Sequence, residues 1–160
     1  MALINFQCDL LGSDVERIPL VDYLVLGDDP YLVAQECTGC GARYFDRRTA
    51  CAGCSQREFR PVEVARAGTL RTFTIVAFAA EGIPVPFVVG VVDCDGTSVR
   101  GNIVNVAPDP EHVTLGMKVR LTTVHVGTDE SGVEAVGYGF EPATRRRAPW
   151  QRTCGFSAST

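Results

Sequence analysis

The chain has 160 residues, of which 46% are hydrophobic, so it can bury a core and is too apolar for a disordered protein. Its formal net charge of −4 argues against a general nucleic-acid-binding protein, because such proteins present a basic face to phosphates. There is no run of about 18 apolar residues and no basic, then apolar, secretion signal at the N-terminus, so we expect a cytoplasmic protein without a membrane partner.

The first 31 residues predict a lead into the folded part of the chain. Residues 1–14 are mixed in character, whereas the apolar spacing over residues 18–26 favours a short helix. The segment Gly27-Asp28-Asp29-Pro30 would break that helix, and residues 31–36 favour a strand. We therefore expect a helical or extended lead over residues 1–31.

Two Cys-x-x-Cys pairs, separated by ten residues, form the most specific pattern in the chain: Cys37 with Cys40, and Cys51 with Cys54. Each short turn lets both of its sulfurs face one ion, and four thiolates suit a closed tetrahedral zinc site. The alternatives are two disulfides, disfavoured without a secretion signal, and a rubredoxin-type iron centre, for which the gap is short. A closed site keeps no position for substrate, so we predict a structural zinc ribbon over residues 32–60.

Positive charge is concentrated in and just after this ribbon. Between Arg43 and Arg71 there are seven arginines and three acidic residues. The planar arginine fork suits phosphate and carboxylate groups, although a solvated arginine-rich surface stays open as the alternative. Tyr44 and Phe45 are expected to cover the metal or the junction with the next domain. The other cysteines, Cys8, Cys94 and Cys154, have no neighbouring histidine and are expected to be unreactive.

After the ribbon the pattern predicts strands, with a bulge near Phe73, a two-residue Asp95-Gly96 hairpin, and a short helix over residues 108–113. A helix between the third and fourth strands of a five-stranded barrel is the arrangement of an OB-fold, which we expect over residues 61–141. The five predicted barrel strands are 69–78, 87–94, 97–106, 118–126 and 133–140, and an extended segment over residues 59–64 precedes them. Residues 142–160 predict an irregular tail, in which Trp150 beside Arg145-Arg146-Arg147 either anchors a partner or packs on the barrel.

No catalytic motif accompanies these elements. The chain lacks Gly-x-Ser-x-Gly, His-Glu-x-x-His and a glycine-rich phosphate loop. The two histidines, His112 and His125, are expected to be surface or packing residues. We therefore assign no catalytic residue, and the sequence favours a binding or scaffolding role.

The order of motifs resembles the zinc-ribbon/OB-fold acyl-CoA-associated proteins catalogued as domain of unknown function 35. The resemblance lies in the start of the ribbon, its second cysteine pair and three barrel segments: residues 32–41, 51–54, 67–74, 86–93 and 115–119. These segments fall within roughly residues 18–140. The sequence departs from the family at Asp46-Arg47-Arg48 and at Ala52, where the family usually has prolines.

The resemblance implies a helical lead, a rubredoxin-like zinc ribbon and a C-terminal OB barrel. It also implies a small, non-catalytic subunit that assembles with a thiolase-superfamily enzyme (thiolase, aldolase or acyltransferase) and helps to form its acyl-CoA site. Arg43, Arg47 and Arg48 are then candidate contacts for the phosphates of coenzyme A. Two other functions stay open: an OB-fold nucleic-acid-binding protein, and a stand-alone thioesterase or transferase acting on CoA thioesters.

Overall fold

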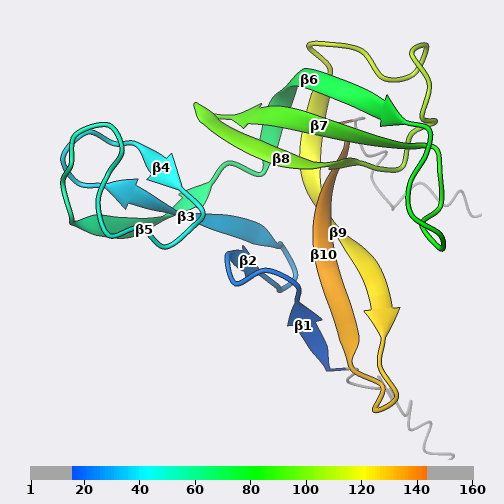
Figure 1. Cartoon of the computed structure of the whole chain (residues 1–160), viewed down its shortest axis with the longest axis horizontal. Helices are drawn as coiled ribbons and strands as arrows, with labels where there is room; N and C mark the ends of the chain where they lie inside the picture. The colour runs from blue at the N-terminus through cyan, green and yellow to red at the C-terminus, as the bar shows by residue number, and fades with distance from the viewer. Residues whose placement is uncertain (1–15, 144–160) are drawn as a thin grey trace, which may run out of the picture.

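The computed structural model describes residues 16–143, which form ten strands and no helix. A barrel and a smaller ribbon sheet project from a shared junction (Figure 1). No helix long and apolar enough to cross a lipid bilayer occurs in the described residues. The predictions for Cys8, Cys154, Arg145-Arg146-Arg147 and Trp150 lie outside this range.

Five strands close the predicted OB barrel: β6 (Ala67–Val76), β7 (Phe87–Cys94), β8 (Thr97–Ile103), β9 (Lys118–Thr128) and β10 (Glu134–Pro142). Their order around the barrel is β6-β7-β8-β10-β9, and β9 pairs back onto β6. The β8–β10 pair is parallel, whereas the other pairs are antiparallel. This closed order confirms the mainly β, OB-fold prediction, and closure leaves the barrel strands without a free edge.

The barrel closes because β6 bends. The pairing of β6 with β7 shifts register between Leu70 and Thr72, close to the bulge predicted near Phe73. Before the bulge β6 pairs with β9, so this one strand is hydrogen-bonded to both β7 and β9 and closes the barrel. Leu70 points into the core and is fully buried, and a Cβ at Gly90 would lie 2.6 Å from its Cδ1 atom. Glycine at position 90 therefore leaves the space that Leu70 fills.

The ribbon sheet is organised around β3 (Tyr31–Cys37). β5 (Phe59–Val64) pairs along one edge of β3, and β2 (Leu24–Val25) and β4 (Arg43–Tyr44) share the other. Alternate side chains of β3 are buried, from Leu32 to Glu36, and Leu32 joins the same apolar core as Leu70. The ribbon and the barrel therefore share one core.

The predicted N-terminal helical lead is wrong for the described residues. β1 (Arg17–Pro19) pairs in parallel with β10, and the backbone N–H of Leu20 continues this pairing by donating to Val136 O at 2.9 Å. Leu24, at the start of β2, is buried in the shared core. A short helix is marginal by itself, and here strand pairing and core burial outweigh the local apolar spacing.

The predicted helix over residues 108–113 is also wrong, because only one turn forms. Asp109 closes this turn: its carboxylate accepts the N–H of Glu111 and of His112, each at 2.9 Å, and its carbonyl accepts that of Val113 at 3.0 Å. The N–H of Gly116 then donates to Leu70 O at 2.8 Å, which returns the chain to β6. Val113 is fully buried, so one turn is enough to place an apolar side chain in the core.

Candidate metal centre and basic pocket

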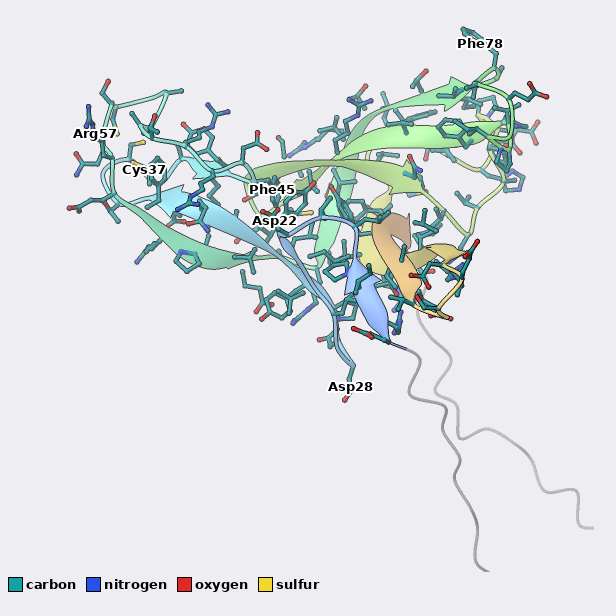
Figure 2. All side chains as sticks on the ribbon, turned by 60° about the horizontal axis from the view of Figure 1, so that its bottom comes forward. Asp22, Asp28, Cys37, Phe45, Arg57 and Phe78 are labelled. Carbon is teal, nitrogen blue, oxygen red and sulfur yellow. The ribbon has the colours of Figure 1, made fainter. Side chains whose placement is uncertain are left out.

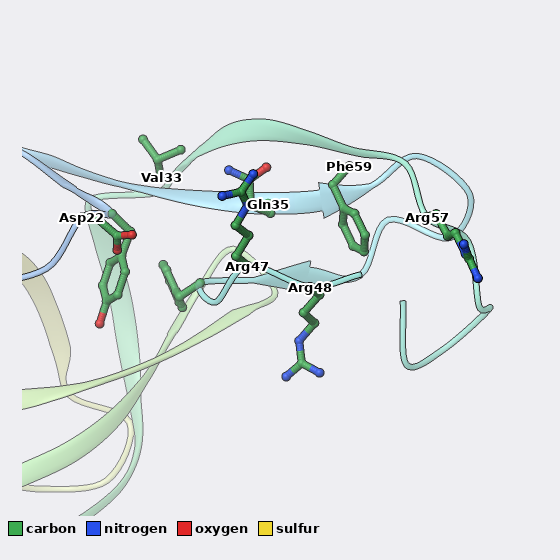
Figure 3. A pocket seen from close by; sticks show the side chains of 9 residues that line it. Asp22, Val33, Gln35, Arg47, Arg48, Arg57 and Phe59 are labelled. Atoms are coloured by element: carbon green, nitrogen blue, oxygen red, sulfur yellow. The ribbon is translucent and has the colours of Figure 1, made fainter. Parts of the chain in front are cut away.

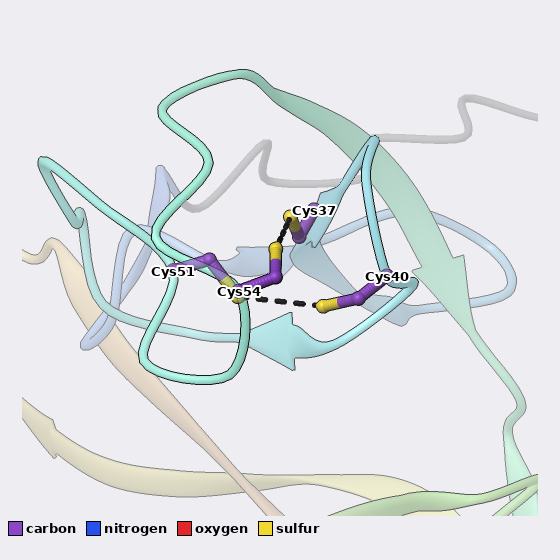
Figure 4. A group of neighbouring side chains, drawn as sticks. All are labelled: Cys37, Cys40, Cys51 and Cys54. Atoms are coloured by element: carbon purple, nitrogen blue, oxygen red, sulfur yellow. Dashed lines mark hydrogen bonds between the residues drawn. The ribbon is translucent and has the colours of Figure 1, made fainter.

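The four cysteines of the ribbon meet at one point (Figure 4). Their Sγ atoms all lie within 4.8 Å of one another, and the Cys37–Cys54 and Cys40–Cys51 pairs are 3.5 Å apart. Tetrahedral zinc with Zn–S bonds of about 2.3 Å separates its sulfurs by about 3.8 Å. The four sulfurs therefore fit around one ion, and none of the described cysteines forms a disulfide.

The two loops that carry these cysteines have the same backbone structure. Cys37 N donates to Ala42 O and Gly41 N to Cys37 O; at the matching positions of the second loop, Cys51 N donates to Gln56 O and Ser55 N to Cys51 O. Gly41 and Ser55 both have positive φ angles, 74° and 60°. Each loop thus directs two sulfurs to the same side, and together the loops enclose the metal position.

Tyr44, the last residue of β4, covers a metal-binding sulfur, and Phe45, which follows it, covers the junction between the ribbon and the barrel, so both predicted positions are occupied. The Tyr44 hydroxyl lies 3.3 Å from Cys51 Sγ, whereas the Phe45 ring packs 4.9 Å from Tyr23 at the ribbon–barrel junction. The hydrogen bond from Tyr44 lowers the pKa of the Cys51 thiol to about 6. Zinc binds the thiolate, so a lowered thiol pKa suits Cys51 to a metal ligand, whereas the pKa values of the Cys40 and Cys54 thiols are raised by the neighbouring thiols.

A pocket of about 410 Å³ lies on the ribbon and is lined in part by side chains of β3, of β5 and of the chain between β4 and β5 (Figure 3). Its full lining is Asp22, Tyr23, Val33, Gln35, Phe45, Arg47, Arg48, Arg57 and Phe59. The pocket therefore combines aromatic walls with three arginines, and its volume is that of a small-molecule site. None of the three arginines forms an ion pair within the described residues, whereas six other arginines do.

Comparison with protein families matches two domains, which meet within β5 of the ribbon sheet. Residues 26–60 match the rubredoxin-like zinc ribbon domain of ChsH2, and residues 61–124 match the C-terminal OB-fold domain of ChsH2. The chain belongs to the ChsH2 zinc-ribbon/OB-fold family. Together with the four-thiol donor set, this membership supports structural zinc in the ribbon.

Two solved structures resemble this ChsH2-family chain. A chain of the "Ltp2-ChsH2(DUF35) aldolase" matches with a TM-score of 0.56 and 25% identity, covering 71% of this chain and 86% of that one. A DUF35-family protein of unknown function from Sulfolobus solfataricus matches with a TM-score of 0.41 and 16% identity, covering 67% and 75% of the two chains. The second likeness is too weak to support an inference about function. Among curated proteins, no significant match is found.

Of the predicted phosphate contacts, Arg47 and Arg48 line the basic pocket and Arg43 does not. The Arg43 guanidinium donates to Glu36 at 2.8 Å and to Thr97 Oγ1 at 3.0 Å. Arg60 also binds Glu36, at 2.5 Å, and these two arginines lower the pKa of this nearly buried carboxyl group. Arg43 thus joins the ribbon to β8, because Thr97 begins that strand.

Arg57, which was not among the predicted phosphate contacts, lines the basic pocket with Arg47 and Arg48. A signal was present, because the ribbon contains a short repeat: Cys37 to Arg43 reads CTGCGAR, and Cys51 to Arg57 reads CAGCSQR. Arg43 and Arg57 each follow the second cysteine of their loop by three residues. The repeat marks Arg57 as the counterpart of Arg43, on the loop that faces the pocket.

The remaining chemistry-bearing side chains of the described residues lie apart from this pocket. Cys94 is fully buried, and burial raises the pKa of its thiol to about 11. His112 contacts the Asp109 carboxylate of its own turn, and His125 contacts Thr128 at 3.0 Å. Both histidines are exposed, as one of the two predicted alternatives had it.

Proposed function

We propose that this chain is a zinc-ribbon/OB-fold subunit of an acyl-CoA-processing complex, in which a thiolase-superfamily enzyme supplies the catalytic nucleophile. The observation that carries the proposal is the likeness to a chain of the Ltp2-ChsH2(DUF35) aldolase over 71% of this chain. Both domains also match ChsH2 family models, in the same order along the sequence. The zinc then holds the ribbon in shape, and the partner carries out the chemistry.

The distribution of reactive groups supports an accessory role. Within residues 16–143, the four clustered thiols fit a closed metal site, and Cys94 is buried in the core. His112 contacts the Asp109 carboxylate of its own turn, and His125 contacts the Thr128 hydroxyl, and both histidines are exposed. Such pairs can act on a substrate only beside a binding site, and neither histidine lines the basic pocket. We therefore assign the reactive groups to the partner subunit.

An apolar loop between β6 and β7 is the surface that we assign to the partner. Phe78 is 87% exposed, and Ile83 and Val85 of the same loop are also exposed. Figure 2 shows Phe78 at the opposite end of the molecule from Cys37 and Arg57. Exposed aromatic and aliphatic side chains gathered on one loop are typical of protein interfaces, where they are buried on association.

The test of this assembly is purification of the tagged full-length chain from its native lysate, followed by gel filtration and mass spectrometry. We expect a thiolase-superfamily enzyme to co-elute with it. Phe78→Ser should weaken that co-elution, whereas Arg100→Ser, at an exposed site on β8, should leave it unchanged. A chain that elutes alone, or that hydrolyses or transfers CoA thioesters by itself, would overturn the accessory role.

The basic pocket supports a second element of the proposal, a direct contact with coenzyme A. Arg47 and Arg48 are without ion-pair partners in the described residues and lie beside aromatic side chains, which suits a ligand with phosphates and a planar base. Arg57 adds a third cation. We assign the phosphates of an acyl-CoA ligand to this pocket.

Calorimetric titration of the zinc-loaded full-length chain, alone and with its partner, would test this contact with coenzyme A as the probe. We expect Arg48→Ala to weaken binding by about tenfold, which corresponds to one lost charge-assisted hydrogen bond. Arg100→Ala is the matched control, because Arg100 also has no recorded ion pair and lies on β8. Equal affinities of the two variants would remove the pocket from the acyl-CoA site.

A further inference from the structure

The three arginines of the basic pocket all lie on loops that the metal holds. Arg47 and Arg48 are between Cys40 and Cys51, and Arg57 follows Cys54 by three residues. Between β4 and β5 the chain has no regular strand or helix. The positions of these arginines therefore depend on what the cysteines bind and on contacts made within the loops.

Tyr44 provides the contact that joins the metal centre to the pocket. Its hydroxyl is 3.3 Å from Cys51 Sγ, and the Arg48 Cζ atom lies over its ring, 4.4 Å from the centroid. The ring also forms a T-shaped contact with Phe59, a wall of the pocket, with 6.1 Å between centroids. One side chain thus touches a metal-binding sulfur, a pocket cation and a pocket wall.

We propose that Tyr44 is a positioning residue that couples the metal centre to anion binding in the basic pocket, an inference that rests on the pocket's proposed role in binding phosphates. The metal-bound Cys51 sulfur fixes the Tyr44 hydroxyl by accepting its hydrogen bond. The face of the fixed ring then holds the Arg48 guanidinium by a cation–π contact. Zinc accordingly does more than stabilise the ribbon, because the affinity of the pocket for an anion follows the occupancy of the metal site.

Two variants of Tyr44 separate the two ends of this link. Tyr44→Phe removes the hydroxyl that meets Cys51 and keeps the ring beneath Arg48, whereas Tyr44→Leu removes both contacts. Tyr31 supplies the matched control, because Arg66 lies over its ring at 5.3 Å and Tyr31 does not line the pocket. Each variant must first be shown to bind one zinc per chain.

The metal end is measured on the cobalt-substituted full-length chain. Loss of a hydrogen bond to a metal-bound sulfur changes the energy of the sulfur-to-cobalt charge-transfer absorption. We expect Tyr44→Phe to shift this band and Tyr31→Phe to leave it in place. Identical spectra for the wild type and Tyr44→Phe would overturn the link between Tyr44 and Cys51.

The pocket end is measured by titrating the zinc-loaded chain with coenzyme A. We expect Tyr44→Leu to weaken binding about fivefold, the effect of losing one cation–π contact, and Tyr31→Leu to have no effect. In the background of Arg48→Ala, Tyr44→Leu should weaken binding no further. Preparations with partial zinc content should bind coenzyme A in proportion to their zinc.

The outcomes distinguish this inference from the proposed function. If the wild-type chain binds coenzyme A through Arg48 but Tyr44→Leu binds equally well, the positioning role is overturned and the acyl-CoA contact stands. Additive effects of Tyr44→Leu and Arg48→Ala would overturn the coupling in the same way. If the zinc-loaded wild type does not bind coenzyme A, alone or with its partner, both the contact and its coupling fail.

Discussion

The two metal-binding loops of the ribbon share two cysteines, a glycine, a final arginine and the same backbone hydrogen bonds, yet the two arginines make different contacts. Arg43, at the end of the first loop, binds Glu36 and Thr97 and joins the ribbon to the barrel. Arg57, at the end of the second, lines the basic pocket. The repeat determines the turn and the direction of the sulfurs, whereas the surroundings of each loop determine what its arginine contacts.

The largest expected effect comes from removing a metal ligand, which should affect both loops equally. Cys37→Ser and Cys51→Ser occupy matching positions, and each should reduce the zinc content from one ion per chain to nearly none and unfold the ribbon. Elemental analysis and thermal unfolding measure this loss. Cys94→Ala, in the barrel core, should lower the melting temperature and keep the zinc. Retention of zinc by either ligand variant would contradict the four-thiol site.

The second prediction uses the two arginines in a crossed comparison. Arg43→Ala should lower the melting temperature clearly, because it removes one of two arginines from the nearly buried Glu36, and should change coenzyme A affinity little. Arg57→Ala should leave the melting temperature unchanged and weaken coenzyme A binding. Thermal unfolding and calorimetry give the two readouts, and the same pattern in both variants would show that the loops do not differ in function.

A smaller effect on stability is expected from substitutions at Gly41 and Ser55, the two loop residues with a left-handed backbone conformation. Gly41→Ala should destabilise the chain by about 1 kcal/mol, because a side chain is disfavoured at positive φ. No atom lies within 4 Å of the added Cβ, so a steric clash does not contribute. Ser55→Gly should stabilise the chain by up to about 1 kcal/mol for the same reason. Denaturant unfolding at constant zinc measures both, and changes of the opposite sign would show that the loops are not equivalent.

The smallest effect concerns the attachment of the first loop to the barrel. Thr97→Val removes the hydroxyl that accepts from Arg43 while keeping the shape of a side chain that is 5% exposed. We expect a loss of stability of about 1 kcal/mol, the net contribution of one hydrogen bond, with zinc content and coenzyme A affinity unchanged. Thr128→Val, at an exposed site on β9, should cost less. A fall in zinc content would mean that the barrel helps to hold the metal loops.

Several features were predictable because they depend on residues close together in the sequence. The two Cys-x-x-Cys pairs predicted the metal cluster, and strand propensity predicted residues 59–64 and 87–94 with the bounds observed for β5 and β7. The Asp95-Gly96 turn was predictable as well, since both residues adopt the positive φ angles that a two-residue hairpin requires. Spacing within a few residues carries this information without any tertiary contact.

Other features were decided only in the folded chain. The N-terminal segment forms strands because it pairs with β10 and buries Leu24 in the shared core. The turn closed by Asp109 does not continue as a helix, because the Gly116 N–H bonds to Leu70 O of β6. Arg43 binds Thr97, which lies 54 residues away in sequence. Arg57 lines the basic pocket with Arg48, whose guanidinium lies over the Tyr44 ring. A local pattern determines which turn or strand a segment prefers. The partner of a charged or aromatic side chain depends instead on which distant element packs beside it. That packing is decided only when the ribbon and the barrel bury their common core.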